Sequence, residues 1–71
     1  MTLLTNEDKL NLVNQHIKGI DFQIYNIQLD LLEANSESPV NSENVSSLNG
    51  RINVLNAKRV ALESEAATLE G

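Results

Sequence analysis

The fold is decided by residues 10–34, which read LNLVNQHIKGIDFQIYNIQLDLLEA. Apolar residues recur in this stretch at alternating intervals of three and four, the spacing of a helix that packs along a partner helix. The members of this first seam are Leu10, Val13, Ile17, Ile20, Ile24, Ile27, Leu31 and Ala34. The stretch therefore predicts one long helix with a continuous apolar side.

A second seam with the same spacing follows in the C-terminal half of the chain. Its members are Val45, Leu48, Ile52, Leu55, Arg59, Leu62, Ala66 and Leu69. Arg59 stands where an apolar residue belongs. It could fix the register or the oligomeric state, or anchor an acidic group such as Asp21. The simplest interpretation is that its stem packs in the seam while its charged head reaches water.

Turn-forming residues separate the two seams. Pro39 disfavours helix in the residue before it, and Asn35, Ser36 and Ser38 favour a turn. Thr5 is a suitable N-cap for the first helix. Caps for the second helix are available at Asn41, Ser42 and Asn44. We predict a single domain over 1–71, with a helix over about 6–34, a loop over about 35–43 and a helix over about 44–70.

A short connection between two such helices makes them antiparallel, so we predict an all-α, antiparallel two-helix coiled-coil hairpin. Two registers are open. The first faces Leu31 with Leu48 and Ile24 with Leu55, whereas the second shifts the pairing by one heptad. We favour the first because every apolar residue then faces another. It also pairs complementary side chains beside the seams, Asp30 with Arg51 and His16 with Glu65.

Four large apolar residues lie off the first seam. We call Phe22, Tyr25, Leu29 and Leu32 the aromatic stripe; at about 100° per residue it lies roughly 150° around the helix from the seam. A helix that is apolar on two sides needs two neighbours. A chain of 71 residues also buries only about 60% of its unfolded surface, so its stability is marginal alone. We expect the hairpin to self-associate into a helical bundle that buries this stripe.

The second helix has its own row off the seam, in which every side chain is small. We call Gly50, Val54, Ala57 and Ala61 the small-residue stripe. Large residues of one copy could fit this shallow row on another, although helix propensity alone also explains the alanines. The predicted interface residues are Phe22, Tyr25, Leu29, Leu32, Val54, Ala57 and Ala61.

No pattern in the chain indicates catalysis or a cofactor. There is no cysteine, and His16 is the only histidine, so neither a thiolate site nor a second imidazole is available. Glycine-rich phosphate loops and nucleophile motifs are absent from the sequence. Closing the hairpin gathers acidic residues at its open end, where we expect a solvated surface rather than a cation site: Glu7, Asp8, Glu63, Glu65 and Glu70. We predict no catalytic, metal or cofactor residues.

The charge of the chain argues against two kinds of partner. A net charge of −5 repels phosphate backbones and anionic lipid surfaces, so we expect neither nucleic acid nor membrane. No stretch reaches the ~20 apolar residues of a membrane span, and Met1–Thr5 lacks a signal-peptide pattern. The expected location is the cytoplasm.

Three segments resemble short helical proteins, without assigned activity, that tailed phages of marine cyanobacteria encode. The segments are 6–10 (NEDKL), 20–27 (IDFQIYNI) and 33–35 (EAN), followed by a second helix rich in Ala and Glu. The resemblance implies a location in an infected bacterial cytoplasm or in a virion. It implies no site residues.

Two functions follow from the aromatic stripe. The first is a non-catalytic assembly module that homo-oligomerises, as a dimer or four-helix bundle, through this stripe. The alternative is a small acidic adaptor or inhibitor that docks the same stripe into a groove of a larger protein. An acidic decoy of a nucleic-acid surface is disfavoured, because ten asparagines interrupt the negative charge.

Overall fold

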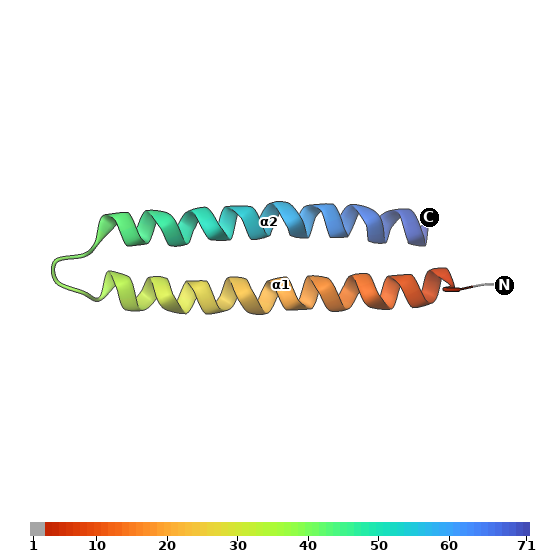
Figure 1. Cartoon of the computed structure of the whole chain (residues 1–71), viewed down its shortest axis with the longest axis horizontal. Helices are drawn as coiled ribbons and strands as arrows, with labels where there is room; N and C mark the ends of the chain where they lie inside the picture. Colours follow the sequence, from red (N-terminus) through yellow and green to blue (C-terminus); the bar gives the residue numbers. More distant parts are fainter. Residues whose placement is uncertain (1–2) are drawn as a thin grey trace.

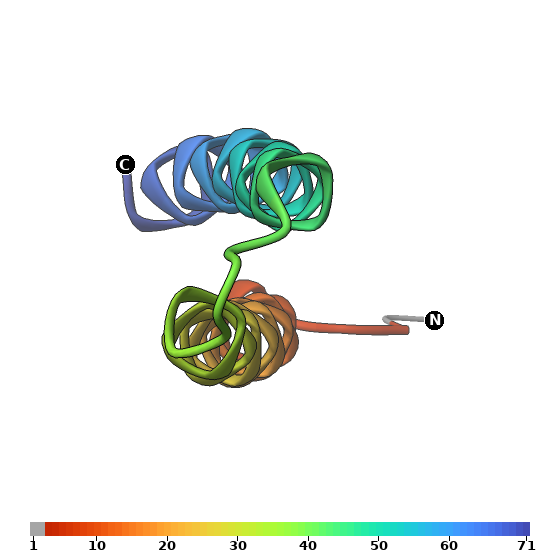
Figure 2. The same cartoon turned by 90° about the vertical axis from the view of Figure 1, so that its left-hand side faces the viewer.

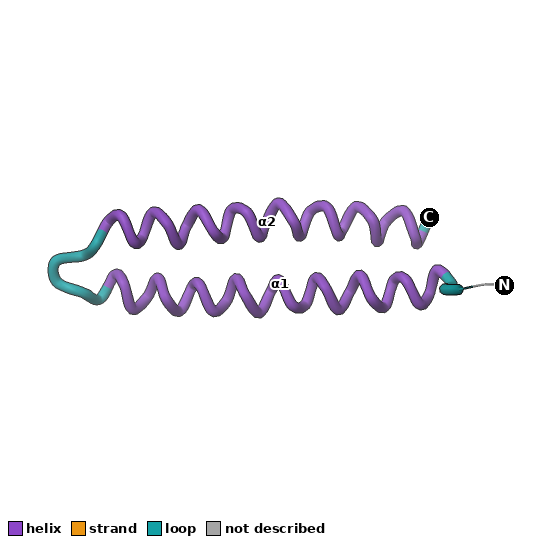
Figure 3. Tube along the Cα trace, viewed as in Figure 1, coloured by secondary structure: helices purple, strands orange, loops and turns teal. Residues whose placement is uncertain are grey.

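The chain folds into two antiparallel α-helices that are connected at one end (Figure 1). The computed structural model describes residues 3–71, and the hairpin measures 60 × 17 × 15 Å. Helix α1 spans Asn6–Asn35 and helix α2 spans Ser42–Glu70, with residues 36–41 as the connection (Figure 3). The end-on view shows that the two helix axes are not quite parallel (Figure 2). The predicted all-α hairpin is confirmed.

Side-chain caps define where both helices begin. The Thr5 hydroxyl accepts a hydrogen bond from the Asp8 N–H at 3.0 Å, and the Asp8 carboxylate accepts one from the Thr5 N–H at 3.2 Å. This reciprocal pair is a capping box. At α2, the Asn41 side chain accepts from the Asn44 N–H at 3.1 Å. Because Asn41 is the cap, α2 begins at Ser42, two residues before the predicted start. Helix α1 ends at Asn35, one residue beyond its predicted end.

The core of the hairpin lies between the two seams. Every seam residue is buried or half-buried. The buried residues are Ile20, Ile27, Ala34, Leu48 and Leu55, which follow one another at intervals of seven on each helix. The other row of each seam, with Ile17 and Ile24 on α1 and Ile52 on α2, is half-buried. One row of each helix therefore faces the partner helix directly, and the other lies at the edge of the contact.

The register follows from contacts between residues far apart in the sequence. Arg59 Nε lies 2.9 Å from the Asp21 carboxylate, and Ala34 and Leu48 line the same hollow. Both contacts, Arg59 with Asp21 and Ala34 with Leu48, are expected in the first register. A shift by one heptad would move Asp21 about two turns, roughly 10 Å, along the helix from Arg59. The hairpin thus has Leu31 level with Leu48 and Ile24 level with Leu55.

The two pairs predicted beside the seam do not form ion pairs. Among residues 3–71, the ion pairs are those that Arg59 makes with Asp21 and Glu63. Asp30, Arg51, His16 and Glu65 are all exposed, and ordering long exposed side chains offsets most of the Coulomb attraction. The seams, rather than charge pairing, set the register.

Replacing Gly19 by alanine should stabilise the hairpin. Gly19 lies inside α1, and a Cβ at this position would meet no atom within 4 Å. The substitution removes the helix penalty of glycine, about 1 kcal/mol, which corresponds to a melting temperature about 4–8 °C higher. Circular dichroism melts at one fixed protein concentration measure this change. A lower melting temperature would show that another molecule packs against Gly19 in solution.

Candidate interaction surface

The aromatic stripe runs along the outer side of α1, in the half of the hairpin near the connection. Three of its four side chains are more than 60% exposed, and Leu29 is less exposed. The exposed fractions are 62% for Phe22, 61% for Tyr25, 39% for Leu29 and 68% for Leu32. Four such residues at helical spacing form one contiguous patch, which marks an interaction surface more often than scattered exposed residues do.

The N-terminal end of this stripe has a defined local shape. Lys18, Asp21, Phe22 and Tyr25 line a hollow of about 320 Å³. The Lys18 ammonium lies 6.0 Å from the centre of the Phe22 ring, at the outer limit of a cation–π contact. Such a contact at an exposed site contributes only about 0.5–1 kcal/mol, so it covers one ring without removing the patch from water.

The small-residue stripe is the corresponding outer surface of α2. All four of its residues are exposed, with Val54 56% accessible. Gly50 and Val54 line a hollow of about 340 Å³ together with Gln23 of α1. A Cβ at Gly50 would meet nothing within 4 Å. This surface is therefore open and shallow.

The two stripes lie on opposite sides of the hairpin. Asp21 and Gln23 are about 200° apart on α1, so they flank the first seam on its two sides. Tyr25 shares a hollow with Asp21, whereas Val54 shares one with Gln23. The hollow at the aromatic stripe is lined by α1 residues alone, whereas the small-residue stripe borders α1 on the Gln23 side, where Ala61 lines the groove between the helices. Within one chain, the two stripes do not meet.

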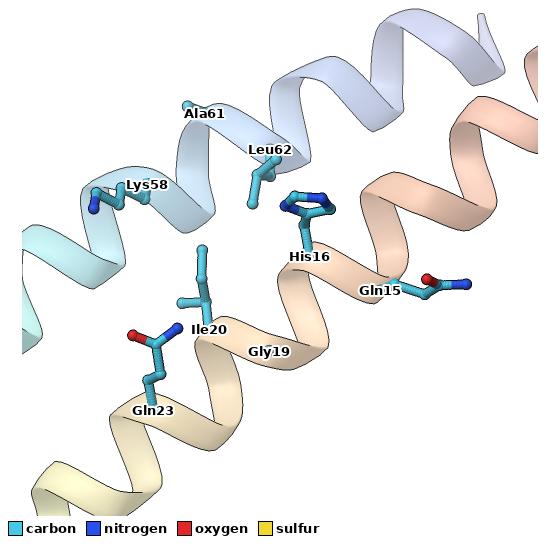
Figure 4. A pocket seen from close by; sticks show the side chains of 8 residues that line it. All are labelled: Gln15, His16, Gly19, Ile20, Gln23, Lys58, Ala61 and Leu62. Carbon is cyan, nitrogen blue, oxygen red and sulfur yellow. The ribbon is translucent and has the colours of Figure 1, made fainter.

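A groove of about 710 Å³ lies between the helices on the Gln23 side (Figure 4). His16, Ile20 and Leu62 point toward the space between the helices, while Gln15 and Lys58 point away from it. Its floor is the edge of the core, because Ile20 is buried and Leu62 half-buried. Two of the lining residues are titratable, His16 and Lys58, and Lys58 points away from the space between the helices. The groove is a surface depression between packed helices.

The acidic open end does not gather its carboxylates into a site. Within residues 3–71, no group of three acidic, histidine or cysteine side chains is close enough together to hold a metal ion. Glu7, Glu65 and Glu70 are all exposed. Asp8 is used in the capping box of α1.

Arg59 combines two of the roles weighed for it. Its stem packs in the seam, and its head reaches Asp21 at 2.9 Å and Glu63 at 4.0 Å. The Nε–H is not directed at the Asp21 oxygen well enough for a hydrogen bond, so this contact is an ion pair. The Arg59 and Asp21 side chains are 39% and 50% exposed, which limits its contribution to roughly 0–1 kcal/mol. Its role in the register stays a prediction.

Two basic residues outside the predicted interface lie beside the small-residue stripe. Arg51 and Lys58 follow Gly50 and Ala57 in sequence and lie beside the small-residue stripe. Neither takes part in an ion pair among residues 3–71. A signal for them exists in the sequence, since the segment 44–62 contains three basic residues and no acidic one.

Comparisons with known proteins identify no relative. No family model, no curated protein and no solved structure matches this chain. The resemblance to phage proteins therefore stays a prediction. In the described part of the chain, neither helix has the length and hydrophobicity needed to cross a membrane.

Replacing Arg59 by leucine should raise the stability of the hairpin. Leucine would add apolar surface to a half-buried seam position, which we expect to contribute about 1 kcal/mol. The matched control is Asp21→Asn, which removes the same ion pair without adding apolar surface and should change stability by less than about 0.5 kcal/mol. Urea unfolding of both variants measures the two changes.

The same variant tests the role of Arg59 in specificity. If Arg59 fixes register or oligomeric state, Arg59→Leu should broaden the distribution of oligomers seen by light scattering. A single sharp species would contradict that role. A loss of stability in Asp21→Asn of more than about 1 kcal/mol would instead show that the ion pair itself holds the hairpin.

Proposed function

We propose that this chain is a non-catalytic interaction module, a coiled-coil hairpin that self-associates through the aromatic stripe and serves an assembly or structural role. The observation that carries the proposal is the exposure of the stripe. Phe22, Tyr25 and Leu32 are each more than 60% accessible in the single chain. Covering them would remove more large apolar side chains from water than any other surface that α1 offers.

The small core supports the same proposal. Five residues are buried in the hairpin, and none of them is a large side chain with less than 2% exposure. Two helices alone can enclose each other on one side only. A second layer of packing on the outer side of α1 would supply the burial that a chain of this size lacks.

The alternative is a small acidic adaptor that docks the stripe into a groove of a larger protein. Asp21 shares a hollow with Phe22 and Tyr25, and the chain has a net charge of −5, so a groove with a basic rim is favoured. The helix-in-groove mode uses anchors at this three and four spacing. For either function we propose a cytoplasmic protein, which would act in infected bacteria or in a virion if the resemblance to phage proteins holds.

Replacing Tyr25 by lysine should disperse the assembly. A charged side chain in the centre of the stripe has to be desolvated in any complex that covers it, so association should fall below detection at micromolar concentration. Because Tyr25 is 61% exposed, the hairpin itself should still fold. Sedimentation velocity of the whole chain over a range of concentrations measures the association, and circular dichroism measures the helix content.

The matched control is Leu12→Lys. Leu12 is also an exposed apolar residue of α1, 46% accessible, and it lies off the stripe. This variant should associate like the wild type. A wild-type chain that stays monomeric at all concentrations would contradict self-association and favour the adaptor. Equal dispersal by both variants would show that the stripe has no special role.

A further inference from the structure

We propose that Asn49 and Gly50 form a deamidation site that the folded hairpin protects and the opened hairpin exposes. This inference does not depend on the proposed self-association. Of the ten asparagines of the chain, Asn49 is the one that a glycine follows. Because glycine has no Cβ, it leaves its peptide nitrogen accessible to the preceding side chain and lets the backbone rotate toward it. The co-reactant is water.

The reaction has two steps. In the first, the Gly50 peptide nitrogen loses its proton and attacks the amide carbon of the Asn49 side chain. A new C–N bond closes a five-membered succinimide ring, the bond to the side-chain nitrogen breaks, and ammonia leaves with the proton. In the second step, water adds to one of the two ring carbonyls and one ring C–N bond breaks. The product is aspartate or isoaspartate, according to the carbonyl that water attacks, and no atom is oxidised or reduced.

The helix opposes the first step. Asn49 and Gly50 lie inside α2, where each peptide N–H donates a hydrogen bond to the C=O four residues earlier. The helix also holds the backbone ψ angle of Asn49 at about −42°, whereas ring closure needs a different rotation about that bond. Both residues are exposed, so water reaches them in the folded hairpin. The backbone conformation, rather than access of water, therefore limits the reaction.

The core decides how much of the hairpin has to open before this N–H is free. Leu48 precedes the pair and Leu55 follows it, and the two are 6% and 8% exposed. Leu48 belongs to the same core cluster as Ile27 and Ala34. Unwinding the turn around Gly50 withdraws Leu48 from that cluster, so fraying at the open end does not expose the pair. The deamidation rate therefore follows the population of hairpins whose packed half has opened.

Modification follows opening and hinders closing. Isoaspartate carries its main chain through the former side chain, which adds one methylene to the backbone between Leu48 and Leu55. These two core residues are two helical turns apart, and the added methylene breaks the helical hydrogen bonds between them and moves them out of line. A chain that stays open long enough to react therefore refolds into a less stable hairpin. The aspartate product keeps the backbone length and adds one negative charge.

Mass spectrometry of the full chain tests this site. The chain is incubated at pH 8 in buffer and in guanidinium chloride, at one fixed protein concentration, and peptide mapping locates each converted asparagine. In guanidinium chloride, Asn49 should convert faster than every other asparagine. In buffer its conversion should be at least about tenfold slower, because only the opened fraction reacts. Circular dichroism of the same samples measures how much of the hairpin is folded.

Two matched variants separate protection by the fold from the intrinsic reactivity of the pair. Leu55→Ala removes a buried side chain, so the hairpin opens more often, and conversion of Asn49 in buffer should rise at least about tenfold. Its rate in guanidinium chloride should stay unchanged. Val60→Ala shortens an apolar side chain of α2 that is 65% exposed, and both of its rates should equal those of the wild type.

Three outcomes would overturn the proposal. One is equal conversion of Asn49 in buffer and in guanidinium chloride while circular dichroism shows a folded hairpin in buffer. Another is a Leu55→Ala variant that converts no faster than the wild type in buffer. The third is faster conversion of a different asparagine in guanidinium chloride, which would show that Gly50 does not set the reactive position.

Discussion

The packing of Ile20, Ile27 and Ala34 against Leu48 and Leu55 is the contact on which the hairpin depends. The helices satisfy their own backbone hydrogen bonds, and their caps act only at the ends, so neither effect holds one helix against the other. Tertiary packing of one apolar row per helix does this. Because these residues recur every seven positions, a shift of one heptad would keep the pattern but change which residues lie level. In the observed register Leu31 lies level with Leu48 and Ile24 with Leu55.

The unequal burial of the two rows explains why an arginine can occupy a seam position. The rows at intervals of seven are not equivalent: one is buried and the other is at the edge, open to water on the side of Asp21. Arg59 belongs to the edge row with Val45 and Ile52. Its aliphatic stem can therefore pack while part of its guanidinium reaches water and Nε, which is buried, lies beside the Asp21 carboxylate. The same residue in the row of Leu48 and Leu55 would have to bury its charge against Ile20 or Ile27.

Spacing in the sequence predicted the helices, their antiparallel arrangement and each residue of the seams, because all of these follow from local periodicity and a short connection. The depth of each row depends on how the helices rotate about their axes, which periodicity does not specify; Ile24 and Ile27 look alike in sequence but differ in burial. The cap at Asn41 was one of three competent residues, so the start of α2 was open. The sequence predicted that Phe22 and Tyr25 lie off the seam of a single copy. The relative placement of the two stripes could be derived only after the register was known.

The aromatic stripe lies on the better-packed half of the hairpin. All five buried residues are between positions 20 and 55, near the connection, whereas seam residues toward the open end, such as Leu10 and Leu69, are half-buried. The line of the aromatic stripe continues toward the N-terminus through the polar residues Asn11, Gln15 and Lys18. A partner on the stripe would thus contact the part of α1 that the core already orders, which lowers the entropy cost of binding. The open end, with its charged residues, is left free to fray without disturbing that contact.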